Sequence, residues 1–416
     1  MPSVDRYRIA MVSSHNVRDP NIFSGAGHYI YKALERSVGD VRFLPPLFPS
    51  GTTCECGRRH TWRRCRNWWY RNVRRIYNLG GINYQWERQH SLSMEYARHY
   101  QRLLADSEEE YDFIFADKGS VQIAHLETSI PILYSCDCTF AALEDYYDKY
   151  SNMLKRTIEQ GHTLERMAIK RADACLFRSE WAAKSAIEDY GADPAKVFVT
   201  LFGPNMDEKY IPRRISRPGR PAQRQCNLLL VGVDWRRKGC DIAIEATRIL
   251  RSRNIDARLT ICGCRKKSRG RLPDFVDHIR FLDKQKPEDV QRLTDLYSLA
   301  DFFIFPTQAE AFGIVLLEAC AFGVPIIAAR TGGVPAIVRH EQNGLLVDQI
   351  QDPRAYAAAI QRALSDSMLY QRCAAGARTF YEKQGNWQAW ADRVREAMNY
   401  TIGRRQTGHG SHMKFA

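Results

Sequence analysis

Short apolar runs alternate with amphipathic stretches along most of the chain. In the first half, five strand-length runs occur in order: YRIAMVSS, YDFIFAD, PILYSCD, DACLFRS and KVFVTLF. Residues 27–37 and 152–171 have the periodicity of helices between them. From Asn227 the alternation starts again with NLLLVGV, LTICG, IRFLD, FFIFP, PIIAA and GLLV. This order predicts parallel βα units, and therefore an α/β protein made of two Rossmann-like domains.

The two halves are separated by a stretch of different composition. The segment PRRISRPGRPAQRQC, residues 212–226, is rich in proline and arginine, which is typical of an interdomain linker. A chain of 416 residues is also too long for one ordinary core. We expect an N-terminal domain over residues 1–210, a linker over 211–225, a C-terminal domain over 226–385, an amphipathic helix over 386–403 and a loose tail over 404–416.

One apolar stretch has nearly the length of a membrane span. Residues 311–329 are mostly apolar over 19 positions. Glu318 near the centre, together with Gly323 and Pro325, instead favours a buried helix followed by a new strand. The N-terminal sequence MPSVDRYRIAMVSSHN lacks the apolar region of a secretory signal. We therefore expect a cytoplasmic protein whose chain begins with a β-strand.

The twelve cysteines fall into two groups. Most lie in apolar, strand-like runs, where reduced thiols serve as small buried hydrophobes. The exception is the polar segment CECGRRHTWRRC, which holds Cys54, Cys56, His60 and Cys65. Three thiolates and one imidazole are a possible zinc site, although the spacing differs from that of a standard finger. The alternative is a loop with incidental thiols.

The chain carries a surplus of 14 positive charges. Residues 58–75 gather eight arginines and three tryptophans. This composition suits peripheral contact with an anionic membrane, where aromatic rings lie at headgroup depth. Nucleic-acid binding is a second interpretation, but no nucleic-acid module is recognisable. The third is a solvated basic face or an acceptor-binding flap.

The segment EAFGIVLLEACAFG, which begins at Glu310, carries the clearest chemical signal. It follows the predicted strand FFIFP and spaces Glu310 and Glu318 eight residues apart, across the start of a helix. Ligands of open α/β sheets collect at the carboxyl ends of strands, and a helix N-terminus favours phosphate. Glu318 is expected about two turns into the helix. The two carboxylates therefore suit hydroxyls at two ends of one phosphate-bearing ligand.

This segment resembles the signature of the retaining nucleotide-sugar glycosyltransferases of family four. The likeness extends to LLLVGVDWRRKGCDIAIEA, LTICGC and RTGGVP, in that order. The resemblance implies the two-lobed GT-B fold, in which two Rossmann-like domains face each other across a cleft. It also implies that the second lobe holds the nucleotide sugar and that the terminal helix crosses back onto the first lobe.

The resemblance also implies roles for residues of the second lobe. Glu310 matches the residue that contacts the transferred sugar, and Glu318 the one that binds the ribose hydroxyls. The diphosphate is expected to bind Lys238 and backbone N–H groups of the loop and helix start. The matching positions are Phe312, Gly313, Ile314 and Val315, together with Gly263 at the strand end in LTICGC.

One departure from the family concerns the cation beside the diphosphate. The usual arginine position, five residues before Lys238, is Val233 in this chain. Fixed cations are needed where the departing diphosphate develops negative charge. Arg236 or Arg237 is expected to substitute, unless this basic turn is simply solvated.

Two features of the first lobe are candidates for acceptor or phosphate contacts. Gly25 and Gly27 follow the first strand and open a helix, which allows close backbone approach to a ligand, but the same residues also suit a tight turn. Their place matches the N-terminal glycine loop of the family. Asp137 ends a predicted strand, where it would either orient an acceptor hydroxyl or cap the following turn. The histidine that family members often have near this position is absent.

Together these features predict a retaining hexosyltransferase that uses a UDP- or GDP-sugar. The expected acceptor is a glycan, lipid-linked glycan or other glycoconjugate, as in polysaccharide biosynthesis. No Asp-x-Asp triplet occurs, so we expect no metal and no cofactor beyond the nucleotide-sugar co-substrate. One alternative is a small soluble acceptor, and another is a non-catalytic sugar-nucleotide or nucleic-acid binder. Nucleic acid is the less favoured partner, and membrane contact would place the enzyme on the cytoplasmic face.

Overall fold

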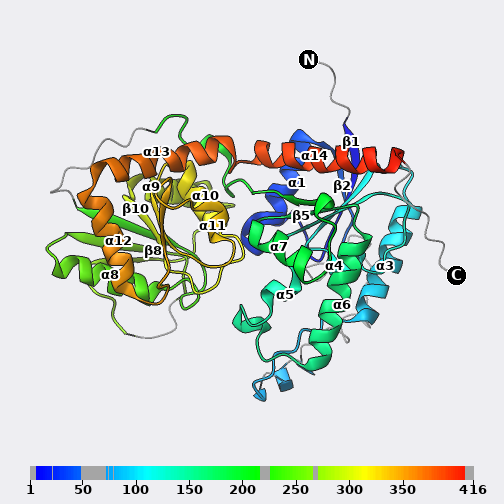
Figure 1. The fold of residues 1–416 in the computed structure, drawn as a ribbon, viewed down its shortest axis with the longest axis horizontal. Helices are drawn as coiled ribbons and strands as arrows, with labels where there is room; N and C mark the ends of the chain where they lie inside the picture. The colour runs from blue at the N-terminus through cyan, green and yellow to red at the C-terminus, as the bar shows by residue number, and fades with distance from the viewer. Residues whose placement is uncertain are drawn as a thin grey trace. The chain divides into compact units, whose positions relative to one another are not determined.

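The chain divides into two compact units. The computed structural model describes residues 6–20, 22–47, 72–73, 75–77, 79–215, 225–265 and 270–407. The first unit comprises Met1–Thr200 with Ala391–Ala416, and the second comprises Leu201–Trp390 (Figure 1). The division therefore falls earlier than the expected boundary at residue 210. The chain returns to the first unit within its last helix, α14 (Trp387–Gln406).

The first unit is built around a parallel sheet with the strand order β2-β1-β3-β4-β5-β6. Its strands are β1 (Tyr7–Ser13), β2 (Gly39–Phe43), β3 (Phe113–Asp117), β4 (Ile132–Cys136), β5 (Ala174–Phe177) and β6 (Val197–Val199). Its helices are η1 (Ile22–Gly25), α1 (Ala26–Ser37), α3 (His90–Ala105), α4 (Ser120–Ile123), α5 (Phe140–Leu143), η2 (Asp148–Tyr150), α6 (Lys155–Arg171), α7 (Glu180–Glu188) and η3 (Pro194–Lys196). Helices α3, α4 and α6 pack against one another.

The second unit repeats this architecture with the strand order β12-β11-β10-β7-β8-β9, again parallel. Its strands are β7 (Cys226–Val231), β8 (Ala257–Cys262), β9 (Val276–Ile279), β10 (Phe302–Phe305), β11 (Ile326–Ala329) and β12 (Gly344–Val347). Its helices are η4 (Glu208–Tyr210), α8 (Cys240–Ser252), α9 (Pro287–Leu299), α10 (Ile314–Ala321), α11 (Val334–Ile337), α12 (Pro353–Ser365) and α13 (Ser367–Lys383). Helix α8 packs against α12, and α10 against α13.

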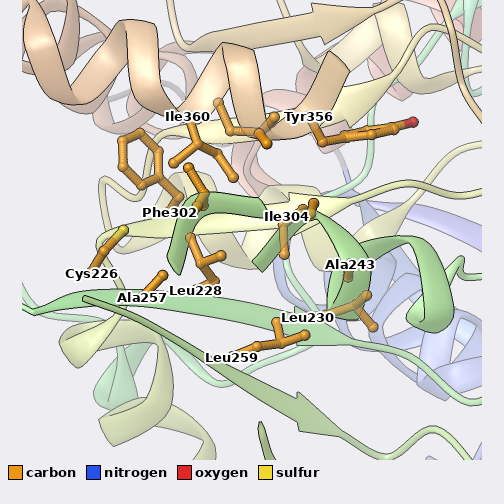
Figure 2. Close-up of a cluster of buried hydrophobic side chains, with 14 of the residues drawn as sticks. Cys226, Leu228, Leu230, Ala243, Ala257, Leu259, Phe302, Ile304, Tyr356 and Ile360 are labelled. Atoms are coloured by element: carbon orange, nitrogen blue, oxygen red, sulfur yellow. The ribbon is translucent and has the colours of Figure 1, made fainter. Parts of the chain in front are cut away.

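Most strands are short apolar runs because helices cover both faces of each sheet. Every residue of β3, β10, β11 and β12 is buried, which is the pattern of parallel sheets. Figure 2 shows how the second core forms between the sheet and its helices. Leu228 and Leu230 of β7 lie in one cluster with Phe302 of β10 and with Tyr356 and Ile360 of α12.

Each sheet has one point where the order of its strands reverses. In the first sheet this point lies between β1 and β3, and in the second between β7 and β10. Ligands of open α/β folds bind beyond the carboxyl ends of the strands at such a point. A ligand is therefore expected beside the segments that leave these four strand ends.

Three details of the secondary structure differ from expectation. The sequence reading missed β2, an edge strand whose polar residues interrupt the apolar pattern. It placed a strand on IRFLD, whereas β9 ends at Ile279, because pairing with β8 sets its register from Val276 onward. It began a helix at residue 152, whereas α6 begins at Lys155. These shifts do not change the order of the elements.

The apolar stretch 311–329 divides into helix α10 and strand β11, as expected for a buried helix followed by a strand. Within the residues that the structure describes, no helix is both long and apolar enough to cross a bilayer. The basic segment 58–75 lies almost entirely outside those residues, so its suggested membrane contact remains a prediction.

The cysteines of the described chain are free thiols, and all of them except Cys136 are buried. This agrees with their expected use as small hydrophobic side chains. Across the described ranges, no group of three or more histidine, cysteine or carboxylate side chains is placed to hold a metal ion. The possible zinc ligands Cys54, Cys56, His60 and Cys65 lie outside the described residues.

Candidate functional site

Two basic side chains converge on Glu310 at the strand reversal of the second sheet. Lys238, in the loop between β7 and α8, forms an ion pair through its Nζ with Glu310 Oε2. Arg237 Nη1 lies 3.3 Å from the same carboxylate oxygen and donates to the carbonyl oxygen of Ala309 over 2.9 Å. Glu310 lies in the loop after β10. The three charged residues therefore lie in the loops that follow the two strands beside the reversal point.

Gly239 sets the backbone that carries Lys238 into this cluster. Its φ of 69° is left-handed, and a Cβ atom at this position would lie 2.0 Å from the carbonyl oxygen of Pro306. Only glycine allows the start of α8 to approach the loop after β10 so closely. The close approach of these two backbones is what places Lys238 beside Glu310.

Gly313 sets the backbone conformation at the start of α10. It is the N-cap residue, it has a φ of 95°, and it has no side chain that could cap the first turn. Ile314 and Val315 form that turn and are half-buried, whereas Phe312 is buried and packs edge-on against Phe202, with ring centroids 5.5 Å apart. The positive end of the helix dipole therefore lies at the end of the loop that carries Glu310.

Burial and charge make this cluster suited to an anion. Burial lowers the pKa of Lys238, and the nearby guanidinium of Arg237 lowers it further, while Glu310 opposes that shift. Lys238 Nζ also lies 4.5 Å from the centre of the Phe305 ring. Two cations and one carboxylate leave a net positive charge next to the N-terminus of α10, where a phosphate group would add favourable interactions.

The geometry identifies the cation that accompanies Lys238. Val233 is 49% exposed and has no charge to offer. Arg236 is exposed, whereas Arg237 is only partly exposed and points its guanidinium at Glu310. Of the two arginines expected to substitute for the missing one, Arg237 is therefore the residue that the structure places in the cluster.

Glu318 lies deeper in the same unit, and both of its carboxylate oxygens are engaged. It is 1% exposed, and Lys284 Nζ lies 2.6 Å from Oε1. The hydroxyl of Tyr297 donates to Oε2 over 2.8 Å. Lys284 also donates to the carbonyl oxygen of Asn205 over 3.0 Å. The sequence analysis did not find Lys284 and Tyr297, because they lie on segments far from the signature.

One expectation about this unit needs correction, and a second stays a prediction. Glu318 is the fifth residue of α10, a little over one turn from its start and not two, because Gly313 delays the helix to Ile314. Gly263 follows β8 as expected, and its backbone N–H donates to the carbonyl oxygen of Ile279 over 3.0 Å. A Cβ atom on Gly263 would lie 2.4 Å from the carbonyl oxygen of Gly232. Close backbone packing alone therefore requires a glycine here, and contact of Gly263 with a diphosphate remains a prediction.

A second charged cluster lies at the carboxyl ends of β3, β4 and β5, next to the strand reversal of the first sheet. Lys118 directly follows β3, and its Nζ lies 2.9 Å from Asp137 Oδ2. Arg178, directly after β5, places Nε 3.9 Å from Asp137 Oδ1 and Nη2 3.6 Å from Asp117 Oδ1. Asp137 does not cap the following turn, because Thr139 is the N-cap of α5 and accepts a hydrogen bond from the backbone N–H of Ala142.

Burial shifts the protonation of this cluster. Burial, reinforced by the charge of Lys118, lowers the pKa of His15 to about 4. Burial raises the pKa of Asp117 to about 6. Burial alone would also raise the pKa of Asp137, but the charges of Lys118 and Arg178 outweigh it and hold that pKa below its usual value. At neutral pH, Asp137 is therefore ionised and His15 is neutral.

Gly25 and Gly27, the two glycines expected to approach a ligand, lie at the start of α1. Gly25 is the N-cap residue of α1, with a left-handed φ of 85°. Gly27 is buried in the first turn, and a Cβ atom on it would lie 2.9 Å from His15 Nε2. Gly27 therefore makes room for His15, which follows β1, whereas a Cβ atom on Gly25 would lie 2.9 Å from the carbonyl oxygen of Pro20. Any direct ligand contact by Gly25 and Gly27 remains a prediction.

Comparison with solved structures defines the class of the fold. Sucrose-phosphate synthase from Thermosynechococcus elongatus is similar over 97% of this chain and 100% of its own, with a TM-score of 0.63 and 18% identity. The Anabaena protein HepE, solved with UDP and glucose, is similar over 95% and 100%, with a TM-score of 0.60 and 15% identity. At such identities the likeness defines the fold alone, and that fold is GT-B.

Sequence comparison then finds similarity to one family of glycosyltransferases. Residues 215–380 match the model of the glycosyl transferases group 1 family. The D-inositol 3-phosphate glycosyltransferase of Kineococcus radiotolerans is 33% identical over 59% of this chain and 61% of its own. The protein of that name from Corynebacterium urealyticum is 31% identical over 55% and 56%. The chain thus spans about three fifths of the length of these relatives.

Proposed function

We propose that the chain is a retaining glycosyltransferase that moves a hexose-like unit from a UDP- or GDP-sugar to a hydroxylated acceptor. The observation that carries this proposal is the convergence of Lys238 and Arg237 on Glu310 at the N-terminus of α10. The match of residues 215–380 to the model of the glycosyl transferases group 1 family and the GT-B fold support it.

In this mechanism the second unit stabilises the departing nucleoside diphosphate. Negative charge develops on the diphosphate as the bond to the sugar breaks. Lys238, Arg237 and the backbone N–H groups at the start of α10 are fixed beside Glu310 before the reaction, so little reorganisation is needed. Glu310, held by both cations, would accept hydrogen bonds from hydroxyls of the transferred sugar. The resemblance to family four implies attack by the acceptor on the face that the diphosphate leaves, with that phosphate taking the acceptor proton.

The ribose would bind at Glu318. A carboxylate has about four acceptor positions, so hydrogen bonds from Lys284 and Tyr297 leave acceptor capacity for ribose hydroxyls. The two protein donors also fix the orientation of the carboxylate. No divalent ion is required in this scheme, because Lys238 and Arg237 supply the positive charge. Metal independence remains a prediction.

The acceptor would bind the first unit, where Asp137 and Lys118 meet. Relatives named D-inositol 3-phosphate glycosyltransferase support a small soluble acceptor. A similar solved structure, with a TM-score of 0.58 and 16% identity, is titled WaaG, a glycosyltransferase involved in lipopolysaccharide biosynthesis. We therefore include a glycoconjugate acceptor in the proposal. We also propose contact with an anionic membrane and a cytoplasmic location.

A thermal-shift screen of the full chain tests the donor half of this proposal. The probes are UDP, GDP, ADP, CDP and their common sugar conjugates. A ligand at one hundred times its Kd adds about 2.7 kcal/mol of stability. We expect UDP or GDP, with its conjugates, to stabilise the wild type and the control K184M, whose lysine is exposed on α7. The response should be lost in K238M and E318A. Stabilisation by no nucleotide, or an equal response in K238M, would contradict the proposal.

A further inference from the structure

The charges next to the strand reversal of the first sheet cancel one another. The cluster contains two cations, Lys118 and Arg178, and two carboxylates, Asp117 and Asp137, which lie within 4 Å of each other in pairs. His15 beside them adds no positive charge at neutral pH, because burial lowers its pKa to about 4. A phosphate group entering here would meet cations that two carboxylates already neutralise.

Only one pair of this cluster is partly exposed. Asp117 and Arg178 are fully buried, whereas the side chains of Lys118 and Asp137 are 18% and 29% exposed. The exposed pair presents one strong donor and one strong acceptor whose charged atoms are 2.9 Å apart. Each hydroxyl of a polyol can both donate and accept, so neighbouring hydroxyls match this pair without any net charge on the ligand.

Aromatic side chains extend from the same end of the sheet. Tyr146 lies in the segment that leads from Asp137 through α5, and Trp181 lies in the first turn of α7, three residues after Arg178. Their ring centroids are 5.1 Å apart, and Tyr147 packs edge-on against Tyr146 at 5.2 Å. All three are half-buried. Because β4 and β5 are neighbouring parallel strands, both segments begin at the same end of the sheet, at the carboxyl ends of these strands.

We propose that the first unit binds the acceptor as a neutral sugar ring, with Lys118 and Asp137 contacting its hydroxyls and the pair Tyr146 and Trp181 covering its apolar C–H face. Binding sites for small molecules typically combine apolar and aromatic walls with a few placed polar groups. The inference rests on the proposed function, and it excludes a phosphorylated acceptor at this site. It therefore separates this chain from its relatives named for inositol 3-phosphate.

Saturation-transfer NMR on the full chain tests this inference. The probes are the methyl glycosides of glucose, mannose and galactose, with inositol 3-phosphate and inorganic phosphate as competitors, all in the presence of the nucleoside diphosphate that stabilises the protein. We expect at least one glycoside to receive saturation, and neither phosphate compound to displace it. The signal should fall roughly fivefold or more in W181L and D137N, whereas W181F should retain most of it. The control Y31L alters a half-buried tyrosine on α1 and should leave the signal unchanged.

The outcomes separate this inference from the proposed function. Displacement of the glycoside by inositol 3-phosphate, equal signals in the wild type, W181L and D137N, or no binding of any glycoside would overturn the neutral-sugar site. A nucleotide-induced thermal shift on the same samples would leave the transferase proposal standing in each case. If no nucleotide stabilises the protein, the proposed glycosyltransferase function is contradicted. Glycoside binding then still tests whether the first unit has a site for a neutral sugar. Circular dichroism of W181L confirms that a lost signal is not lost folding.

Discussion

At the scale of single residues, tertiary contacts bring the charged side chains of the candidate site together. Glu310 and Glu318 could be found from the sequence because a short segment holds both with recognisable spacing. Lys284 and Tyr297, the partners of Glu318, could not, because only the folded chain brings them to that carboxylate. In the same way, Arg178 meets Asp117 across many intervening residues. A strand followed at once by a cation, as in FIFADK and ACLFR, was the available signal for Lys118 and Arg178.

The hydroxyl of Tyr297 yields a prediction at this scale. Y297F removes the donor to the buried Glu318 carboxylate, and hydrogen bonds to charged groups contribute about 1.5–3 kcal/mol. We expect a loss of about 2 kcal/mol in the free energy of unfolding of the second unit, measured by urea denaturation. Calorimetry should show weaker binding of the nucleoside diphosphate. In the control Y356F, the lost hydroxyl donates to the carbonyl oxygen of Ile350, so binding should be unchanged. Equal binding by both variants would refute the proposed role of Glu318.

His15 and Asp117 predict a dependence of stability on pH. The pKa of His15 is lowered to about 4 in the folded chain, so the unfolded chain binds more protons between about pH 4 and pH 6.5, and stability falls as the pH drops through that window. The raised pKa of Asp117, about 6, acts in the opposite direction. H15Q should therefore gain about 2–3 kcal/mol relative to the wild type between pH 7 and pH 4.5. Urea denaturation at both pH values measures this difference, and a pH-independent difference would contradict it.

At the scale of elements, the fully buried strands were the most predictable. Strands β3, β10, β11 and β12 are apolar throughout because helices cover both faces. The errors fell on edge strands: β2 was missed, and β9 was placed too late. An edge strand is paired on one side only and lies nearer to solvent. Its apolar run is therefore interrupted by polar residues and is harder to recognise in the sequence. The phase of α10 was also misjudged, because its start depends on the left-handed backbone at Gly313.

Gly239 yields the prediction at this scale. A Cβ atom on it would collide with the carbonyl oxygen of Pro306, and its φ of 69° is already unfavourable for other residues. G239A should separate the start of α8 from the loop after β10, lower the melting temperature and abolish nucleotide-induced stabilisation. The matched control is G191A, which has a φ of 66° but no neighbouring atom within 4 Å. It should cost about 1 kcal/mol and keep the nucleotide response. Equal effects of the two variants would show that strain alone decides the outcome.

At the scale of the whole molecule, the chain uses one plan twice. Each unit has a six-stranded parallel sheet, and each gathers charges at or next to the point where its strand order reverses. The repeated alternation of apolar runs made this plan predictable from sequence, together with a GT-B fold. The division at Thr200 was less predictable, because residues 201–210 were expected in the first domain and residues 211–215 in the linker, yet both stretches belong to the second unit.

The end of α14 yields a prediction about the two units. Arg405 Nη2 lies 2.9 Å from Asp173 Oδ1, and Arg404 Nη1 lies 2.9 Å from Asp193 Oδ2, all within the first unit. Exposed ion pairs contribute about 0–1 kcal/mol each. Deletion of residues 404–416 should therefore lower the melting temperature only slightly. The nucleotide response should be unchanged, because its residues lie in the second unit. Differential scanning fluorimetry with and without nucleotide measures both effects, and a lost response would contradict this separation of tasks.

The central claim is that Lys238, Arg237 and Glu310 assist the departure of a nucleoside diphosphate from a sugar. The most direct test is to incubate the wild type and K238M with UDP- and GDP-sugars, with and without methyl glycosides, and to measure the nucleoside diphosphate released. We predict release by the wild type with one donor class, acceleration by an acceptor, a product whose anomeric configuration matches the donor, and at least a hundredfold lower rate in K238M, about 2.7 kcal/mol in the barrier. Equal rates in the wild type and K238M, or no release from any donor, would contradict the claim.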